Sequence, residues 1–320
     1  MNQLSIFILK VSRNLYNKLL PNPKVLTIVN HDPDSVATII HDLLQRDKPC
    51  MIGRFGSTEL SCMINYAGTK NHKNKYFSYI AGKTPQWWWQ QSKIDQMQLW
   101  SGFFPATVEK VEQFCSLMLS DISMVDLLGF FREEENYFDY LLGKHEKVDF
   151  ELLNPYFSKI PWTRALEGKK VLVIHPFAQT IRSQYKKREL LFANNLLPAF
   201  ELQTIQAVQT IAGIKTEFAD WFEALNFMKR QIDETDYDIC LIGCGAYGFP
   251  LAAHVKRQGK KAFHLGGSLQ LLFGIRGKRW ENENYNPTYN FAKLINEHWV
   301  KPGDVERPQG AEKVEDACYW

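Results

Sequence analysis

The regular alternation of apolar strand patterns with amphipathic helical patterns after residue 169 constrains the fold of this chain most strongly. The strand patterns cover 170–175, 201–207, 238–242 and 261–265, and the helical patterns between them cover 178–193, 217–234 and 246–258. Strands separated by helices of this length form right-handed βαβ units and pair in parallel. The sequence therefore predicts an α/β, Rossmann-like fold whose mostly parallel sheet carries helices on both faces.

The first half of the chain adds further strands and helices to this pattern. Strands are expected at 50–54 and 122–128, and helices at 34–45, 93–100 and 107–120. After Trp299 the pattern lapses into turns that contain Pro and Gly, which is typical of a terminal segment. We divide the chain into an N-terminal helical segment (1–48), an α/β domain (49–300) and a C-terminal tail (301–320).

The N-terminal segment is basic and amphipathic. Residues 1–31 contain no acidic residue and four basic ones, Lys10, Arg13, Lys18 and Lys24. An apolar set at helical spacing shares one face of a helix: Leu4, Ile8, Val11, Leu15 and Leu19. Two interpretations follow. The favoured one is a terminal helix packed on the domain, and the other is an amphipathic helix that makes a peripheral contact with an anionic membrane surface.

Composition and cysteine usage limit the functional class. The 38 basic and 35 acidic residues give a net charge of +3, which argues against a strongly basic nucleic-acid binder. The six cysteines include no CxxC pair, and no apolar run reaches the roughly 18 residues of a membrane-spanning helix. We therefore expect reduced thiols in a cytoplasmic protein, at most peripheral at the inner face of the membrane, with no nucleic-acid partner.

A glycine-rich turn follows the strand expected at 238–242. Its sequence, Gly243-Cys-Gly-Ala-Tyr-Gly248, fits GxGxxG and lets a backbone and a helix N-terminus approach a phosphate closely. A dinucleotide site also needs an acidic residue about 20 positions later to hold a ribose, and there is none between Ala246 and Trp280. That stretch instead carries a charge of +7, against +4 for residues 1–31 and −8 for the rest, so the near-neutral total conceals two basic blocks.

The turns around the second basic block are expected to bind a diphosphate. The residues expected to form a nucleotide cradle are Gly243, Gly245, Gly248, Gly266 and Gly267. Arg276 and Arg279 follow a further glycine turn and are expected to face phosphate oxygens. Tyr247 either stacks on a base or a sugar or packs in the core.

The first strand ends in a second polar motif, Arg54-Phe-Gly-Ser-Thr-Glu59. Ligands bind beyond the carboxyl ends of parallel strands, so functional residues are expected just after Arg54, His175, Ala207, Ile242 and Leu265. Arg54 is expected to face phosphate oxygens, and Glu59 to hold a metal or act as a base, although an acid in the first turn of a helix is also ordinary. His175 is either a second candidate base or a histidine satisfied in the core.

Three separated segments, 54–59, 242–248 and 266–280, together resemble the GT-D-type glycosyltransferases, first catalogued as a domain of unknown function. The resemblance covers roughly residues 50–280. It implies a Rossmann-like sheet and transfer of a hexose from a nucleotide diphosphate sugar, such as a UDP-sugar. The implied acceptor is a glycan or a lipid-linked or protein-linked glycoconjugate in cell-surface polysaccharide or glycoprotein synthesis. The resemblance also implies a divalent metal, Mn²⁺ or Mg²⁺, held by an Asp-X-Glu motif.

This chain departs from that motif at its first acidic position. Ser57 stands where the family has Asp, and only Glu59 is kept. A serine hydroxyl is a poor substitute for a carboxylate on either ion. Either Glu59 holds the metal together with diphosphate and water, or basic side chains neutralise the leaving group instead. Two other functions stay open: an NAD(P)-dependent oxidoreductase that uses the glycine turn, and a non-catalytic nucleotide-sugar-binding protein.

Overall fold

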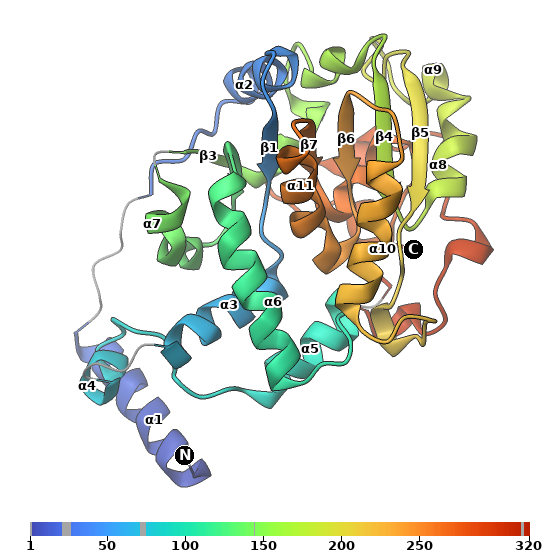
Figure 1. The fold of residues 1–320 in the computed structure, drawn as a ribbon. Coiled ribbons are helices and arrows are strands. Elements are labelled where there is room, and N and C mark those ends of the chain that lie inside the picture. The colour runs from blue at the N-terminus through green and yellow to red at the C-terminus, as the bar shows by residue number, and fades with distance from the viewer. Residues whose placement is uncertain (1, 21–26, 71–74, 144, 315–316) are drawn as a thin grey trace.

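A seven-stranded sheet in which every neighbouring pair is parallel forms the centre of the protein (Figure 1). The computed structural model describes residues 2–20, 27–70, 75–143, 145–314 and 317–320. The strands are β1 (Cys50–Gly53), β2 (Leu127–Phe130), β3 (Glu146–Asp149), β4 (Lys170–His175), β5 (Glu201–Gln206), β6 (Ile239–Ile242) and β7 (Lys261–His264). Their order is β3-β2-β1-β7-β6-β4-β5, which confirms the predicted α/β fold with a mostly parallel sheet.

Helices cover both faces of this sheet and extend beyond it at the N-terminal end. In the first half of the chain they are α1 (Gln3–Leu19), α2 (Pro33–Gln45), α3 (Ser57–Lys70), α4 (Lys75–Ile80), α5 (Gln91–Ser101), α6 (Val108–Asp121) and α7 (Asp139–Leu142). In the second half they are α8 (Ala178–Tyr185), α9 (Arg188–Leu191), α10 (Trp221–Asp233), α11 (Gly248–Arg257), α12 (Leu269–Leu272) and α13 (Lys278–Glu281).

Each face of the sheet has its own apolar core, because successive strand residues point to opposite faces. In β4, Leu172 and Ile174 belong to the core that also contains side chains of α6, α10 and α11. Val171 and Val173 belong to the core shared with α2, α8 and α12. A sheet buried on both faces needs apolar residues at consecutive positions, which is why its inner strands have continuous apolar runs in the sequence.

Three elements differ from the expected pattern. The strand expected at 122–128 is β2 at Leu127–Phe130, because Ile122–Met124 forms a 3-10 turn after α6. The helix expected at 178–193 is divided into α8 and α9, since the N–H of Lys187 bonds to the carbonyl of Gln184 in a tighter turn. No apolar run marks the edge strand β3, because Val148 is the one fully buried residue among its four.

β4 and β6 are parallel neighbours in the sheet, and the chain adds its next strand on opposite sides of this pair: β5 beside β4, and β7 beside β6. From β4 the chain crosses to β5 through α8 on one face, and from β6 it crosses to β7 through α11 on the opposite face. In open α/β sheets a crevice forms at such a switch point, beyond the carboxyl ends of the strands. The glycine-rich turn follows β6 and His175 ends β4, so both lie at this point.

The segment after residue 300 packs into the protein although its sequence has no periodic pattern. It contains short 3-10 turns at Asp304–Glu306 and Ala311–Lys313, whose period matches neither an α-helix nor a strand. Val314 and Trp320 are buried in the core shared with α8. The residues expected as a C-terminal tail thus contribute to this core.

The two N-terminal helices are placed differently. α2 packs Val36 and Ile40 against the sheet. α1 lies beside α4 and away from the sheet (Figure 1). Within the described ranges, no helix has the length and apolar character needed to cross a bilayer.

Candidate functional site

A cavity of about 390 Å³ lies at the carboxyl edge of the sheet, and segments that follow all seven strands line it. Each strand contributes at least one lining residue at or after its end: Arg54 after β1, Phe131 after β2, Glu151 after β3, His175 at the end of β4, Thr210 after β5, Gly243 after β6 and Gly266 after β7. The five strand ends expected to carry functional residues therefore meet in one cavity.

The glycine-rich turn needs each of its three glycines for a different steric reason. A Cβ atom at Gly243 would lie 2.5 Å from the carbonyl oxygen of Gly266, in the turn after β7. Gly245 has a φ of +57°, a conformation that side chains disfavour. A Cβ atom at Gly248 would overlap the imidazole of His264, so this glycine allows α11 to pack closely on β7. Gly243 and Gly245 line the cavity, whereas Gly248 lies behind the wall.

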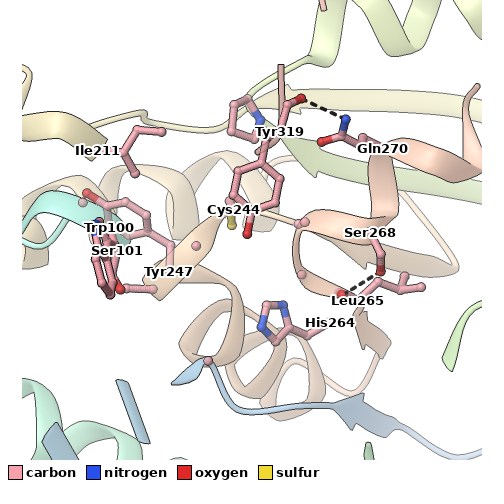
Figure 2. A pocket seen from close by; sticks show the side chains of 18 of the residues that line it. Trp100, Ser101, Ile211, Cys244, Tyr247, His264, Leu265, Ser268, Gln270 and Tyr319 are labelled. Carbon is pink, nitrogen blue, oxygen red and sulfur yellow. Dashed lines mark hydrogen bonds between the residues drawn. The ribbon is translucent and has the colours of Figure 1, made fainter. Parts of the chain in front are cut away.

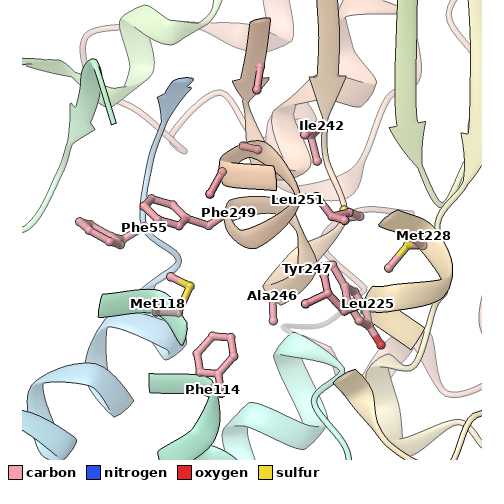
Figure 3. Close-up of a cluster of buried hydrophobic side chains, with 14 of the residues drawn as sticks. Phe55, Phe114, Met118, Leu225, Met228, Ile242, Ala246, Tyr247, Phe249 and Leu251 are labelled. Atoms are coloured by element: carbon pink, nitrogen blue, oxygen red, sulfur yellow. The ribbon is translucent and has the colours of Figure 1, made fainter. Parts of the chain in front are cut away.

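Tyr247 supports the glycine turn from the core side. Its ring stacks on Trp221 of α10, with the ring centroids 4.9 Å apart and the planes at 9°. It is 2% exposed, and its hydroxyl oxygen lies 3.4 Å from Oγ1 of Thr210. Figure 3 shows the side chain within the apolar cluster that also contains Leu225 and Met228. The structure shows packing in the core, the second role expected for Tyr247, and Tyr247 is also among the residues that line the cavity.

Arg54 brings a positive charge to the cavity, where it lowers the pKa of the Glu151 carboxyl group. Its guanidinium carbon lies 5.2 Å and 5.4 Å from the ring centroids of Phe131 and Phe150, and its Nε donates to the carbonyl of Phe55 at 3.1 Å. The two rings hold the cation through its interaction with their π faces. A Cβ atom at Gly266 would lie 3.8 Å from the Arg54 side chain, so the guanidinium reaches the turn after β7.

Ser57 and Glu59 lie at the N-terminus of α3 and line the cavity. The Glu59 side chain is 8% exposed and folds back so far that a Cβ atom at Gly56 would overlap its carboxylate. This position places a negative charge at the positive end of the helix dipole.

The side chains available as metal ligands can be compared with those that the implied divalent metal needs. Within the described ranges, no group of three or more His, Cys, Asp and Glu side chains is arranged to hold a metal ion. The motif itself offers one carboxylate, from Glu59, and one hydroxyl, from Ser57. Hard divalent cations take six or more oxygen ligands, several of them charged when the protein supplies the site. These residues therefore do not fit a divalent cation held by the protein's own side chains.

Two buried histidines border the cavity in their neutral form. Burial lowers the pKa of His175 and of His264 to about 3. The Nδ1 atom of His175 accepts a hydrogen bond from the N–H of Phe177 at 3.0 Å. An imidazole with so low a pKa is a weak proton acceptor near neutral pH, so the role of a satisfied, buried histidine suits His175 better than that of a base.

Glu151 is a lining residue that the sequence patterns did not reveal. It follows β3 in the 3-10 turn Phe150–Leu153, and burial raises its pKa to about 7, although the side chain of Asn286 and the charge of Arg54 lower it. Asn286 and Asn154 donate to its two carboxylate oxygens at 3.2 Å and 3.4 Å. No sequence signal pointed here, because β3 lacks an apolar run.

The other two arginines expected to face phosphate, Arg276 and Arg279, occupy different places. Arg279 lines the cavity, where it donates to the hydroxyl of Tyr319 at 3.4 Å and to the sulfur of Cys318 at 3.2 Å. Arg276 does not line the cavity, and its Nε lies 3.6 Å from a carboxylate oxygen of Glu281. Only Gly277 and Lys278 stand between the two arginines in sequence, yet one arginine lines the cavity and the other forms an ion pair outside it.

Other members of the basic block stabilise the fold. Lys256 forms an ion pair with Asp126 at 2.6 Å, and Arg257 pairs with Asp121. Asp121 is fully buried, so its charge requires such a partner. Most of the +7 charge counted in the sequence is therefore outside the cavity.

The C-terminal residues close one side of the cavity, which the sequence did not indicate. Tyr319 and Trp320 both belong to its lining. The backbone carbonyl of Tyr319 accepts a hydrogen bond from Gln270 of α12 at 3.1 Å, and the Tyr319 ring covers Gly267 (Figure 2). Trp100 of α5 adds a partly exposed aromatic side chain to the lining.

Comparison with known proteins gives one fold-level likeness. No family model matches the chain, and no curated protein matches it. Among solved structures, the chain is similar to one described as "The highly conserved domain of unknown function 1792 has a distinct glycosyltransferase fold". The sequence identity is 11% and the TM-score 0.38, over 96% of this chain and 98% of the other. Similarity at this level transfers no residue role to this chain.

Proposed function

We propose that this protein is a glycosyltransferase that moves a hexose from a nucleoside diphosphate sugar, such as a UDP-sugar, to a glycan or glycoconjugate acceptor. The observation that carries the proposal is the pairing, in one cavity, of an anion-binding wall with a buried carboxyl group whose pKa is near 7. The wall consists of the glycine turn at the N-terminus of α11 together with Arg54 and Arg279.

The anion-binding wall suits the leaving diphosphate. Glycosyl transfer breaks the bond between the anomeric carbon and the diphosphate oxygen, so negative charge develops on that oxygen. Arginine side chains and helix N-terminal amides stabilise such charge when they are in place before the reaction. Arg54 is held in place by Phe131 and Phe150, and its position beside Gly266 puts it next to the expected cradle.

Glu151 suits the proton transfer from the acceptor. As the acceptor oxygen bonds to the anomeric carbon, its hydroxyl proton must leave, and a general base works best when its pKa is near the operating pH. Glu151 has a pKa of about 7, whereas that of His175 is about 3. We therefore assign the proton to the Glu151 carboxylate. Glu59 stays the second candidate for this role, because it lines the same cavity.

We propose a cytoplasmic setting for this activity, and the state of the thiols supports it. All six cysteines are buried and form no disulfide among the described residues, which fits the reducing cytoplasm. A non-catalytic nucleotide-sugar-binding protein is the second candidate function, favoured by Ser57 at the position of the family's first metal-binding acid.

A thermal-shift panel with UDP-hexoses, NAD⁺ and NADP⁺, each with Mn²⁺ or with EDTA, tests the proposal. UDP-sugars are expected to raise the unfolding temperature, equally in EDTA, and slow donor hydrolysis is expected to accompany binding. Arg54→Gln is expected to weaken UDP-sugar binding by about 10- to 100-fold, through the loss of charge-assisted hydrogen bonds. Arg276→Gln is the matched control, because Arg276 lies outside the cavity lining, and it is expected to bind as the wild type does.

The alternatives predict different results in the same panel. Stabilisation by NAD(P) alone would refute the glycosyltransferase and favour an oxidoreductase. Binding of UDP-sugars with neither hydrolysis nor transfer would leave the non-catalytic binder. Stabilisation that requires Mn²⁺ would restore the metal role expected for Glu59.

A further inference from the structure

An apolar stripe on α1 faces solvent. Six side chains form it, each 48–71% exposed: Leu4, Phe7, Ile8, Val11, Leu15 and Leu19. At 100° per residue they fall within an arc of roughly 120° on one side of the helix. An amphipathic helix of a globular protein normally buries such an arc against the core, so the exposure of this one requires an explanation.

The side of α1 away from the stripe attaches the helix to the protein. Leu9 is buried in a small cluster with Tyr79 of α4 and Trp88. The guanidinium of Arg13 lies 4.6 Å from the centre of the Tyr79 ring and donates to the carbonyl of Thr84 at 3.3 Å. These contacts fix the rotation of the helix about its axis, and the stripe therefore points away from the protein. The helix therefore packs on the protein, as in the favoured interpretation, but through Leu9 and Arg13 and not through its apolar set.

The apolar surface continues onto α4. Tyr76 and Phe77 are each about two-thirds exposed, and the Phe77 ring packs edge-on against Tyr16 of α1 at 6.4 Å. α1 and α4 together project from the rest of the molecule (Figure 1). A surface formed on such a projection can meet a flat partner without obstruction by the α/β body.

The charges beside the stripe indicate what it meets. The helix contains no acidic residue. The exposed Lys10 lies outside the stripe, beyond its Phe7 edge, and the exposed Lys18 lies at that same edge, between Phe7 and Val11 around the helix. Long lysine side chains reach from a helix at a membrane surface to the headgroup phosphates. A second copy of this chain, paired stripe to stripe, would instead bring basic side chains together with no acid on α1 to neutralise them. Lys24, counted in the basic segment, lies outside the described residues.

We propose that α1 docks this protein on an anionic lipid bilayer. The helix lies in the plane of the interface, with the six-residue stripe among the acyl chains and with Lys10 and Lys18 at the phosphates. Amphipathic helices with lysines on the polar side and Leu, Ile or Phe on the other bind membranes in this manner. The proposal is independent of glycosyl transfer.

Sedimentation of the full chain with vesicles tests this docking. The vesicles are phosphatidylcholine alone and phosphatidylcholine with about one-third phosphatidylglycerol, a content at which surface charge attracts basic segments. The stripe variant carries Ile8→Ser and Leu15→Ser, and the charge variant carries Lys10→Gln and Lys18→Gln. The control variant carries Ile160→Ser and Val305→Ser, two exposed apolar residues outside α1. All substituted side chains are exposed, so unfolding temperatures are expected to match the wild type.

The wild type and the control are expected to bind the anionic vesicles and not the neutral ones. The stripe variant is expected to lose about tenfold or more in partitioning, from removed apolar burial, and the charge variant to lose its preference for anionic lipid. Failure of the wild type to bind, or equal binding by the stripe variant, would overturn the proposal. A dimer in light scattering that the stripe variant dissociates, without vesicle binding, would make a second copy the partner instead. Donor binding is measured separately, so neither result depends on the other.

Discussion

Replacing Glu151 by Gln removes a carboxyl group that burial holds at a pKa of about 7, against an ordinary value of 4.5. Because the folded protein binds this proton more tightly than the unfolded chain, the group lowers the free energy of unfolding as pH rises from 4.5 through 7. At 1.36 kcal/mol for each pH unit, the full effect is about 3 kcal/mol above pH 7. Below pH 4.5 the group is protonated in both states and has no effect.

Glu151→Gln is therefore expected to be more stable than the wild type at pH 8 and not at pH 4.5. The glutamine amide must face one of the donating side chains, Asn154 or Asn286, and this lost hydrogen bond reduces the gain at pH 8 to about 2 kcal/mol. Urea unfolding of both proteins from pH 4.5 to 8 measures the difference. His175 and His264 are present in both proteins, so their own titration cancels.

The same variant tests the assignment of the base. Wild-type turnover is expected to fall below pH 7 as Glu151 takes up a proton, and Glu151→Gln is expected to lose about 10²- to 10⁴-fold in kcat together with that pH dependence. Glu135→Gln is the matched control. Glu135 is fully buried and burial raises its pKa to about 8, but it does not line the cavity. Its replacement is expected to raise the free energy of unfolding at alkaline pH and to leave the fall of turnover below pH 7 unchanged.

Two results would refute this reasoning separately. A stability difference between wild type and Glu151→Gln that stays constant from pH 4.5 to 8 would mean that the carboxyl group has an ordinary pKa. A stability difference that grows as expected, with the acid limb of turnover unchanged, would mean that Glu151 is buried but is not the base.

Three further substitutions test the packing behind the cavity and the state of His175. Gly248→Ala is expected to cost about 1–3 kcal/mol of stability in urea unfolding, because the new methyl group meets the buried His264 ring, whereas Gly53→Ala, with ordinary contacts, is expected to cost less. Trp221→Ala is expected to cost about 3–5 kcal/mol, since the ring is fully buried, and a loss below 1 kcal/mol would contradict the packing. His175→Asn is expected to remove a loss of stability that sets in as pH falls below 6.5, because the wild-type imidazole is held neutral with a pKa of about 3. The turnover of His175→Asn is expected to fall below pH 7 as that of the wild type does. If His175 were the base, this substitution would abolish that pH dependence.

The fold was predictable from the sequence because local patterns report burial directly. Runs such as 170–175 and 238–242 are apolar at consecutive positions, and this pattern arises when both faces of a strand are covered. The edge strand β3 escaped prediction for the same reason, since Val148 alone is fully buried there. The break between α8 and α9 depends on a tight turn at Lys187 that leaves no trace in the apolar period.

The location of the site was predictable for a topological reason. Parallel strands end at one edge of their sheet, so the order of elements alone brings the segments after Arg54, His175 and Ile242 together. Glu151 was not predictable. Its pKa depends on burial and on Asn286, which lies 135 residues away in sequence.

What the sequence determined by itself is which segments can be strands and helices, which glycines stand in turns, and that α1 has an apolar face and a basic one. Only the tertiary structure decided which side of each element meets the rest of the protein. Arg279 reaches the cavity and Arg276 does not, and α1 is held by Leu9 and Arg13 so that its apolar stripe faces outward. The physical reason is that an amphipathic pattern records a contrast between two faces, whereas the partner of each face is set by segments distant in the chain.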